Sequence, residues 1–372
     1  MRLRDAQRFA RALTIVAGCL LAIAAGFACR YRFAEPLKRT SYDLPFVWRS
    51  DLDTHEIVLV YLDEESAKRL HQPIDDIWNR TLHVPLLERL TNDGARLIVY
   101  DFVFDTPSAD PTRDVAFAAA LQSFGKAILG GTLEIVQEMG GINQERIIAP
   151  LKLLRKGAAG WGILAFRPVD ADYAVRELFP GTSDVPSATW KAAEVLGAPA
   201  TREPREARVQ RWINYYGPKN AFASINFARA LDSDGVPPGF FKNKIVMVGG
   251  RSAVGYLGTG RDEFRTPYTR RRFHQLTSGL EVQATILLNL LREEWLTSIP
   301  EKRENVIFIL VGLMAGALAA LRPSIAVASA LISSLAIACL ACWLVWHRHV
   351  WFNWMIPAAI QMPLGLVWSV GS

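Results

Sequence analysis

Apolar residues form long, almost uninterrupted runs at both ends of the chain. The runs are residues 12–29, 305–321, 324–346 and 350–370. A helix of about 20 apolar residues crosses the roughly 30 Å hydrocarbon core of a lipid bilayer. The pattern therefore predicts four transmembrane helices, one before and three after a more polar central segment, residues 30–304.

The central segment alternates between short apolar runs and helical patterns. The runs are rich in Val and Ile, which is typical of strands buried on both faces of a parallel sheet. The predicted strands are residues 56–63, 96–105, 126–135, 208–216 and 244–250, and the predicted helices are residues 82–92, 114–124 and 279–291. The alternation indicates an α/β fold with a largely parallel sheet and covering helices. The less periodic residues 137–185 receive no assignment.

Charge predicts the orientation in the membrane. Residues 1–11 hold four Arg, and the cytoplasmic flanks of membrane helices carry an excess of Lys and Arg. We therefore expect residues 1–11 in the cytoplasm, residues 30–304 outside it, and the C-terminus inside again after four crossings. Ten apolar residues follow Cys19, where a lipoprotein-like stretch ends, so an uncleaved helix is favoured over a processed signal.

Composition and motifs argue against several classes of function. Residues 30–304 carry nearly equal numbers of basic and acidic side chains, so no nucleic-acid partner is expected. All four Cys lie in the apolar end runs, which excludes a cysteine metal site in the central segment. The glycine loop at residues 250–255 lacks the Lys and the hydroxyl of a nucleotide-binding loop. Asp170 and Asp172 are interpreted as a solvated turn in preference to half of a carboxylate site. We expect no enzyme activity, no metal and no cofactor.

Two of the predicted membrane helices carry small residues at intervals of four. These residues are Gly18, Ala22 and Gly26 in the first helix and Gly312, Gly316 and Ala320 in the second. Small residues let helix backbones approach closely within a bilayer. The spacing favours packing inside one four-helix bundle, and a homodimer or a contact to a membrane partner protein stays open as the alternative.

Seven motifs, in order, resemble a known family of sensory domains. They are EIVLVYLDEES, IWNRTLH, GARLIVYDFVF, INYYGPKNAF, GFFKNKIVMVGG, DEFRTPY and SGLEVQATILLNLL. With one membrane helix before them and three after, they resemble CHASE domains of the second class. These are extracellular sensory modules associated with bacterial cyclases and histidine kinases. The resemblance covers nearly the whole chain.

The resemblance implies a sensory input module anchored in the inner (cytoplasmic) membrane. An extracytoplasmic domain would detect an unknown signal, and the membrane helices would pass it to a cytoplasmic kinase or cyclase. Because this sequence ends at Ser372, we expect the output in cis if the chain is a piece of a longer protein, and in trans if it is complete. Two positions depart from the family. Ile77-Trp78-Asn79 replaces a Trp-Pro-Trp, and Gln283 replaces a histidine of the final helix.

Strand ends and motifs supply candidate ligand contacts, since ligands of parallel sheets bind beyond the carboxyl ends of the strands. The candidates are Asp63, Arg80, Asp101, Tyr215 and Glu281. A second set could bind an anion or lipid headgroups, because guanidinium groups match phosphate and carboxylate: Arg261, Arg265, Arg270, Arg271 and Arg272. Each candidate also has a structural interpretation, such as a helix cap, a core position, an ion pair or an exposed loop.

A function of a different class stays open at this point. The chain could be a structural or adaptor subunit of a membrane complex that binds no ligand. The two faces of small residues and the absence of an output domain from this sequence favour that interpretation.

Overall fold

The computed structural model describes residues 2–32, 34–73, 77–137, 143–166, 170–250, 263–269 and 275–371, which form two compact units. The helical unit comprises Met1–Arg49 and Leu296–Ser372, and the sheet unit comprises Ser50–Trp295. Each unit has a hydrophobic core of its own. The central segment predicted from the sequence, residues 30–304, thus contains the whole sheet unit and short parts of the helical unit.

The sheet unit is built on seven strands in the order β4-β3-β2-β7-β1-β6, with β5 paired to β3 beside this path. The strands are β1 (Ile57–Leu62), β2 (Leu97–Val103), β3 (Ala127–Gln137), β4 (Asn143–Ile148), β5 (Gly160–Ile163), β6 (Ala223–Asn226) and β7 (Ile245–Gly250). All of these pairings are parallel except that of β3 with β4. The largely parallel sheet of the predicted α/β fold is confirmed.

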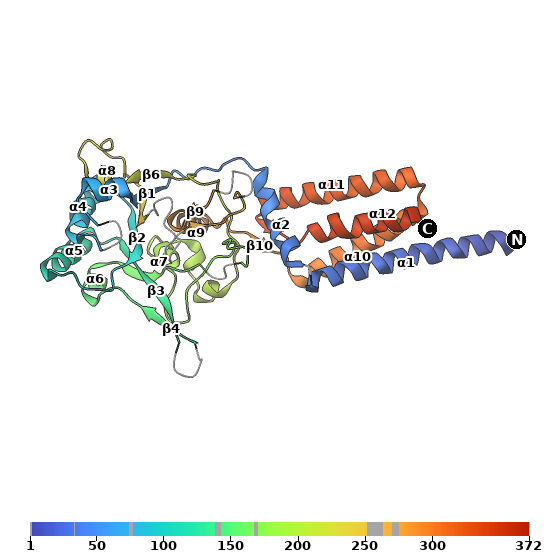
Figure 1. Cartoon of the computed structure of the whole chain (residues 1–372), viewed down its shortest axis with the longest axis horizontal. Helices are drawn as coiled ribbons and strands as arrows, with labels where there is room; N and C mark the ends of the chain where they lie inside the picture. Colours follow the sequence, from blue (N-terminus) through green and yellow to red (C-terminus); the bar gives the residue numbers. More distant parts are fainter. Residues whose placement is uncertain are drawn as a thin grey trace. The chain divides into compact units, whose positions relative to one another are not determined.

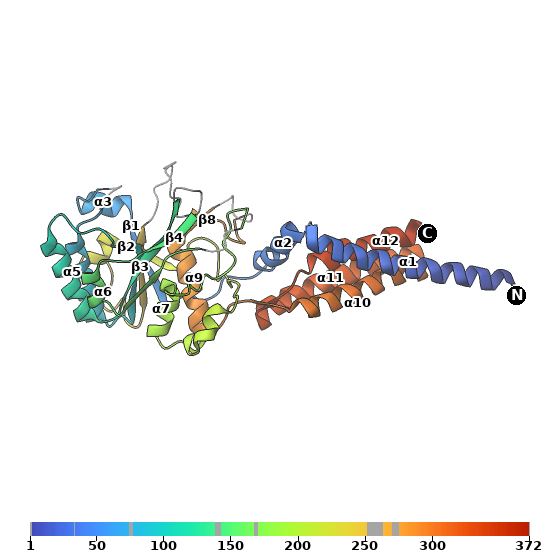
Figure 2. The same cartoon turned by 90° about the horizontal axis from the view of Figure 1, so that it is seen from below.

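Helices cover both faces of this sheet (Figures 1 and 2). One face carries α3 (Glu64–Arg69), α4 (His83–Asp93), α5 (Pro111–Phe124), α6 (Lys152–Gly157) and α8 (Phe227–Leu231). The other face carries α7 (Ala188–Val195), which packs on β3 and β5, and α9 (Gly279–Arg292), which packs on β1 and β7. The alternation of side chains along each strand therefore supplies two cores, one on each side of the sheet.

Local signals in the sequence explain where the helices begin and end. The Asp110 carboxylate accepts a hydrogen bond from the Thr112 amide at 3.0 Å, and Pro111 occupies the first turn of α5. The helices α4 and α5 end at Gly94 and Gly125, whose φ angles of 75° and 68° fall in the left-handed region that favours glycine. These caps fix the lengths of the helices that cover β2.

Residues 208–216 do not form the predicted strand. Within the described part of the chain, the bridge between Trp212 and Glu177 is isolated. The Ile213 amide donates to the Arg176 carbonyl at 2.8 Å, and the Asn214 amide donates to Oδ1 of Asn289 on α9 at 2.7 Å. The side chain of Asn289 therefore accepts a backbone hydrogen bond that a neighbouring strand would otherwise accept. The segment packs inside the unit without joining the sheet.

The helical unit contains three helices that are long and apolar enough to cross a membrane, counted over the described residues. They are Gln7–Arg30 within α1 (Arg2–Arg32), Glu301–Ala320 across α10 (Glu301–Ala317) and η4 (Leu318–Ala320), and Pro323–Arg348, which is α11. These three coincide with the first three predicted spans.

The predicted fourth span, residues 350–370, is not one continuous helix, and three candidates stand in place of four. It begins with β11 (Val350–Trp351), which pairs with β10 (Thr297–Ser298). A π-helical turn, η5 (Pro357–Gln361), then leads into α12 (Met362–Gly371). The strand shortens the helix that follows, and Pro357 stands at the start of the π-helical turn, because proline cannot continue the usual backbone hydrogen bonding.

An additional helix, α2 (Ala34–Val47), forms hydrogen bonds with two tryptophan side chains of this unit. The indole N–H groups of Trp354 and Trp346 donate to the carbonyls of Ser41 and Pro45 at 2.8 and 2.9 Å. The Ser41 hydroxyl also donates to Oδ1 of Asn353 at 3.0 Å. The segment directly after α1 is therefore tied to the end of α11 and to the chain that follows it.

Candidate functional site

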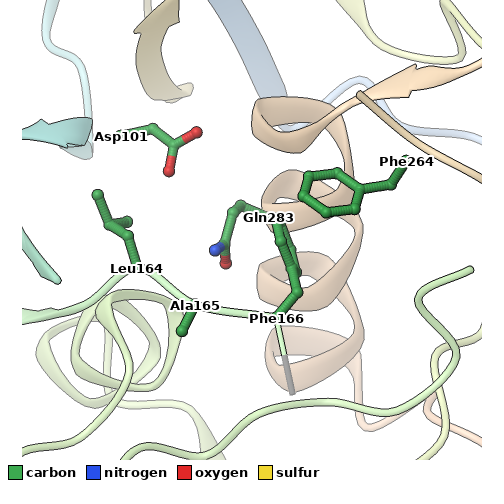
Figure 3. Close-up of a pocket in the computed structure, with 6 residues that line it drawn as sticks. All are labelled: Asp101, Leu164, Ala165, Phe166, Phe264 and Gln283. Atoms are coloured by element: carbon green, nitrogen blue, oxygen red, sulfur yellow. The ribbon is translucent and has the colours of Figure 1, made fainter. Parts of the chain in front are cut away.

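A cavity of about 320 Å³ lies in the sheet unit at the carboxyl end of β2 (Figure 3). The described residues that line it are Asp101, Leu164, Ala165, Phe166, Phe264 and Gln283. They come from β2, from the segment after β5, from β8 (Glu263–Phe264) and from α9. Four stretches that are far apart in the sequence thus meet where ligands of parallel sheets usually bind.

Asp101 reaches the cavity because of its register in β2. It follows Leu97 and Val99 in steps of two residues, so it points to the face that α7 and α9 cover. Its neighbour in β7 is Gly249. A Cβ atom on Gly249 would lie 3.0 Å from Cδ1 of Leu280 and 3.2 Å from Cβ of Asp101. Glycine at this position therefore lets α9 pack closely beside Asp101.

Gln283 enters the cavity from α9, whose start is firmly held. The Ser278 hydroxyl caps the helix by accepting from the Glu281 amide at 3.3 Å, and it lies 2.8 Å from the Tyr61 hydroxyl. The side chain of Gln283 is only 3% exposed, and its amide makes no hydrogen bond with any residue that the structure describes. Figure 3 shows this amide turned toward the space between Asp101, Leu164 and Ala165.

Apolar groups form the rest of the lining. The rings of Phe166 and Phe264 meet edge to face, with their centroids 4.5 Å apart. The Leu164 amide donates to the Gly131 carbonyl at 2.7 Å, which continues the β5–β3 pairing by one residue. Leu164 also packs against Gly130, where a Cβ atom would lie only 2.2 Å from its Cδ1. Glycines in β3 therefore admit the apolar wall of the cavity.

Two of the predicted ligand contacts, Asp63 and Arg80, form polar contacts that stabilise the fold. Asp63 caps α3 by accepting from the Ser66 amide at 2.9 Å. Arg80 is 2% exposed and forms an ion pair with Asp114, with 2.5 Å between Nη1 and Oδ1. It also donates to the Thr106 carbonyl. Neither side chain is among those that line the cavity.

Two other predicted contacts hold the α7 and α9 side of the sheet together. The buried Tyr215 hydroxyl donates to the Val175 carbonyl at 2.8 Å. Oε1 of Glu281 accepts from the Ala221 amide at 2.8 Å, and the residue is 4% exposed. Of the five candidate ligand contacts, Asp101 alone is among the described residues that line the cavity.

The predicted anion site is described at one position. Arg265 is exposed. Its backbone amide donates to the Tyr173 carbonyl, and its carbonyl accepts from the Val175 amide, at 3.2 Å each. The other four arginines lie outside the described residues: Arg261, Arg270, Arg271 and Arg272.

Asp170 and Asp172 form ion pairs with a buried arginine. Asp170 and Asp172 both accept from the guanidinium of Arg176, which is 3% exposed. No group of three or more potential metal ligands occurs in the part of the chain that the structure describes.

Sequence reasoning overlooked most of the lining, although three motifs contain it. Asp101 lies in GARLIVYDFVF, Phe264 in DEFRTPY, and Gln283 in SGLEVQATILLNLL. The Gln at position 283, noted as a departure in the resemblance, was the available signal. Leu164, Ala165 and Phe166 come from a stretch with no clear periodicity, and no sequence signal pointed to them.

The fold is that of a protein with candidate membrane helices and a mixed α/β domain. The family model for the CHASE2 domain matches residues 16–318, and the chain belongs to this family. CHASE2 domains are extracellular sensory domains, so part of this chain is extracytoplasmic. Searches of curated proteins and of solved structures found no match.

Proposed function

We propose that this chain is a membrane-anchored sensory input module whose sheet unit binds a small molecule in the cavity beside Asp101. The observation that carries the proposal is the buried Gln283 amide, which faces the cavity and has no hydrogen-bond partner among the described residues. The amide is held in place by the buried helix and faces the cavity, where a bound molecule can reach it. A ligand with a matching donor or acceptor can form a hydrogen bond with it.

The chain connectivity supports transmission of the signal through the membrane. Gln283 is part of α9, and residues 293–300 alone separate α9 from α10, the first of the closing helices. A ligand that contacts Gln283 acts on the element that leads directly into a membrane span. It can shift the helices between two arrangements only if it binds one of them more tightly.

The proposed topology places the output in the cytoplasm of a bacterial cell. With residues 355–371 as a fourth, shorter crossing, both termini would lie on the cytoplasmic side of the inner membrane. A kinase or cyclase would then receive the signal, in cis or in trans. The protein itself is proposed to have no enzyme activity.

The test is thermal unfolding of the full chain in lipid nanodiscs with a panel of small metabolites. The variant Ala165→Phe fills the cavity, and Ala116→Phe places the same ring on the exposed side of α5 as a control. At a ligand concentration 100 times Kd, binding stabilises a protein by about 2.7 kcal/mol. We expect at least one compound to raise the melting temperature of the wild type and of Ala116→Phe but not of Ala165→Phe.

Two results would overturn the proposal. One is a panel that leaves the wild type unchanged while a stoichiometric protein partner co-purifies, which would identify an adaptor subunit instead. The other is stabilisation of Ala165→Phe to the same extent as the wild type, which would place the ligand outside this cavity.

A further inference from the structure

We infer that one end of the helical unit, which carries Arg8, Arg11 and Arg322, binds the headgroups of anionic phospholipids. The inference goes beyond the proposed function, because it concerns the membrane helices and needs no ligand in the cavity. It rests on the position of these three arginines, on the scarcity of acidic residues that accompany them, and on exposed apolar side chains at the same end.

A contact between two helices brings the three arginines to the same end of the unit. The Arg11 guanidinium of α1 donates to the Ala320 carbonyl at the end of η4. Arg322 follows two residues later and directly precedes α11. Arg8 lies three residues before Arg11 in α1 and is therefore its neighbour on the helix surface. All three arginines are exposed.

The three arginines also lie at the ends of the candidate membrane helices. One candidate span begins at Gln7, a second ends at Ala320 and a third begins at Pro323. In a bilayer such helix ends lie near the headgroup region, and arginine side chains close to them extend their charged groups into it. The guanidinium groups would therefore meet the phosphate groups of the lipids at the same depth.

Few acidic groups accompany these arginines. Residues 305–372 contain no Asp or Glu, and Asp5 is the one acidic residue among residues 1–29. Arg8 and Arg322 form no ion pair or hydrogen bond with any residue that the structure describes. Asp5 can neutralise one positive charge at most, so at least two of the three guanidinium groups remain for an external anion.

Basic residues at the other end of the unit have acidic partners. Arg30, at the end of the first candidate span, forms ion pairs with Glu301 and Glu304 of α10 at 3.2 and 3.6 Å. Arg39 of α2 pairs with Glu35 at 3.8 Å. The chain itself therefore supplies the counter-charge at that end, whereas the end with Arg8 and Arg322 requires it from outside.

Apolar side chains beside the three arginines favour a lipid over a free anion. Phe9 and Leu13 of α1 are 73 and 60% exposed, and Leu321 is 40% exposed. A phospholipid combines a phosphate, which accepts hydrogen bonds from guanidinium groups, with acyl chains that cover apolar side chains. Inorganic phosphate offers the first of these alone. An anionic phospholipid therefore matches this end of the unit better than a free anion does.

The experiment compares two short-chain lipids of equal chain length, phosphatidylglycerol and phosphatidylcholine. Each is titrated into the full chain in neutral detergent, and native mass spectrometry measures the dissociation constant of the bound lipid. A basic side chain near an anionic lipid surface contributes about fivefold to binding, so we expect phosphatidylglycerol to bind at least about tenfold more tightly. Arg8→Gln combined with Arg322→Gln should bring the two lipids to within about threefold of each other.

Two further variants test whether charge at this end is the cause. Arg348 is exposed in the last turn of α11, so Arg348→Gln removes the same charge from the other end of that helix and should keep the wild-type preference. Arg8→Lys combined with Arg322→Lys keeps the positive charges and should keep most of the preference. Unchanged melting temperatures would show that each variant is folded.

The inference is overturned if the wild type binds the two lipids equally tightly, or if the double glutamine variant keeps the preference. It is also overturned if inorganic phosphate displaces phosphatidylglycerol at an equal concentration, which would indicate a site for free anions in place of a lipid site. None of these results bears on the cavity, so the proposed function stands or falls by its own test.

Discussion

Gly26 of α1 and Gln361 at the end of η5 lie in direct contact within the helical unit. A Cβ atom on Gly26 would lie 2.6 Å from Nε2 of Gln361, and Gln361 is fully buried. The same Nε2 donates to the carbonyls of Ala22 and Phe308 at 3.1 and 2.8 Å. One polar side chain thus joins α1 and α10 to the last helix, at a site that glycine keeps open.

The other small residues of the two predicted faces have neighbours in the same unit. A Cβ atom on Gly18 would meet Trp368, and one on Gly312 or Gly316 would meet Ile23 or Cys19 of α1. Ala22 is fully buried, and the Ala320 carbonyl accepts from Arg11. The small residues of both faces therefore pack against other helices of the same unit.

The first prediction concerns the contact between Gly26 and Gln361. Gly26→Val forces Gln361 away from its two carbonyl acceptors, so we expect the bundle to lose about 1–3 kcal/mol of stability. The measurement is the loss of helicity of the full chain on titration with sodium dodecyl sulfate. The matched control is Ala24→Val, which adds similar bulk to an exposed position of the same helix and should change stability by less than about 0.5 kcal/mol. Equal losses in the two variants would contradict the role of the contact.

A second prediction concerns the buried pair of Arg80 and Asp114. Asp114 also accepts from the amide and hydroxyl of Ser108 at 2.9 and 2.6 Å, so it joins three elements beside β2. Removal of one member of a buried ion pair leaves a charge without compensation and typically costs about 3–5 kcal/mol. We expect Asp114→Ala to lower the unfolding free energy of the sheet unit by that amount in chemical denaturation of the full chain.

The control for that variant is an exposed ion pair. Nζ of Lys68 and Oε2 of Glu64 lie 3.8 Å apart on the surface of α3. Such pairs contribute between about 0 and 1 kcal/mol, so Glu64→Gln should be nearly neutral. A loss below 1 kcal/mol for Asp114→Ala would show that the buried pair is not needed for folding.

The third prediction is a pH dependence that arises from His83. This side chain is 1% exposed and packs among the rings of Tyr100, Phe117 and Phe227. Burial disfavours the imidazolium, and the neighbouring Arg80 adds to the effect, so the pKa of His83 falls from 6.5 to about 3. The unfolded chain therefore takes up a proton at a higher pH than the folded chain does.

The sign of the effect follows from this difference in proton binding. The stabilising contribution is complete above pH 6.5 and is lost as the pH falls from 6.5 toward 3. Between pH 6.5 and 5 the loss is about 2 kcal/mol for one such site. His83→Phe keeps an aromatic ring without titration, so its unfolding free energy should fall less than that of the wild type over this interval. Parallel profiles of the wild type and the variant would contradict the assignment.

The sequence predicted the strands and the edge of the sheet better than it predicted the cavity. Asp101 was found because an acidic residue at the end of an apolar run stands out in the pattern. Glu281 was chosen and Gln283 was not, although both lie on α9. Successive residues of a helix are about 100° apart, so these two side chains point in nearly opposite directions. Which of them reaches the cavity depends on how α9 docks on the sheet.

That docking depends on close contacts which spacing does not reveal. Leu164 reaches the cavity because Gly130 leaves room for it on β3. The run at residues 208–216 was assigned to a strand because an extended apolar segment has the same pattern whether its partner is a strand or, as here, the side chain of Asn289. Tertiary contacts decide both cases, and local propensity does not report them.

The last prediction uses two adjacent glycines of β7 to test whether the docking of α9 shapes the cavity. A Cβ atom on Gly249 would lie 3.0 Å from Leu280 of α9 and 3.2 Å from Asp101, whereas a Cβ atom on Gly250 would have no atom of the described residues within 4 Å. Gly249→Ala should therefore displace α9 or Asp101, lower the melting temperature of the full chain and weaken the binding of any stabilising ligand by about tenfold or more. Gly250→Ala changes the backbone entropy in the same way without the steric contact, so it should keep wild-type affinity. If both variants bind the ligand as the wild type does, the close packing of α9 on β7 is not what positions Gln283 and Asp101 in the site.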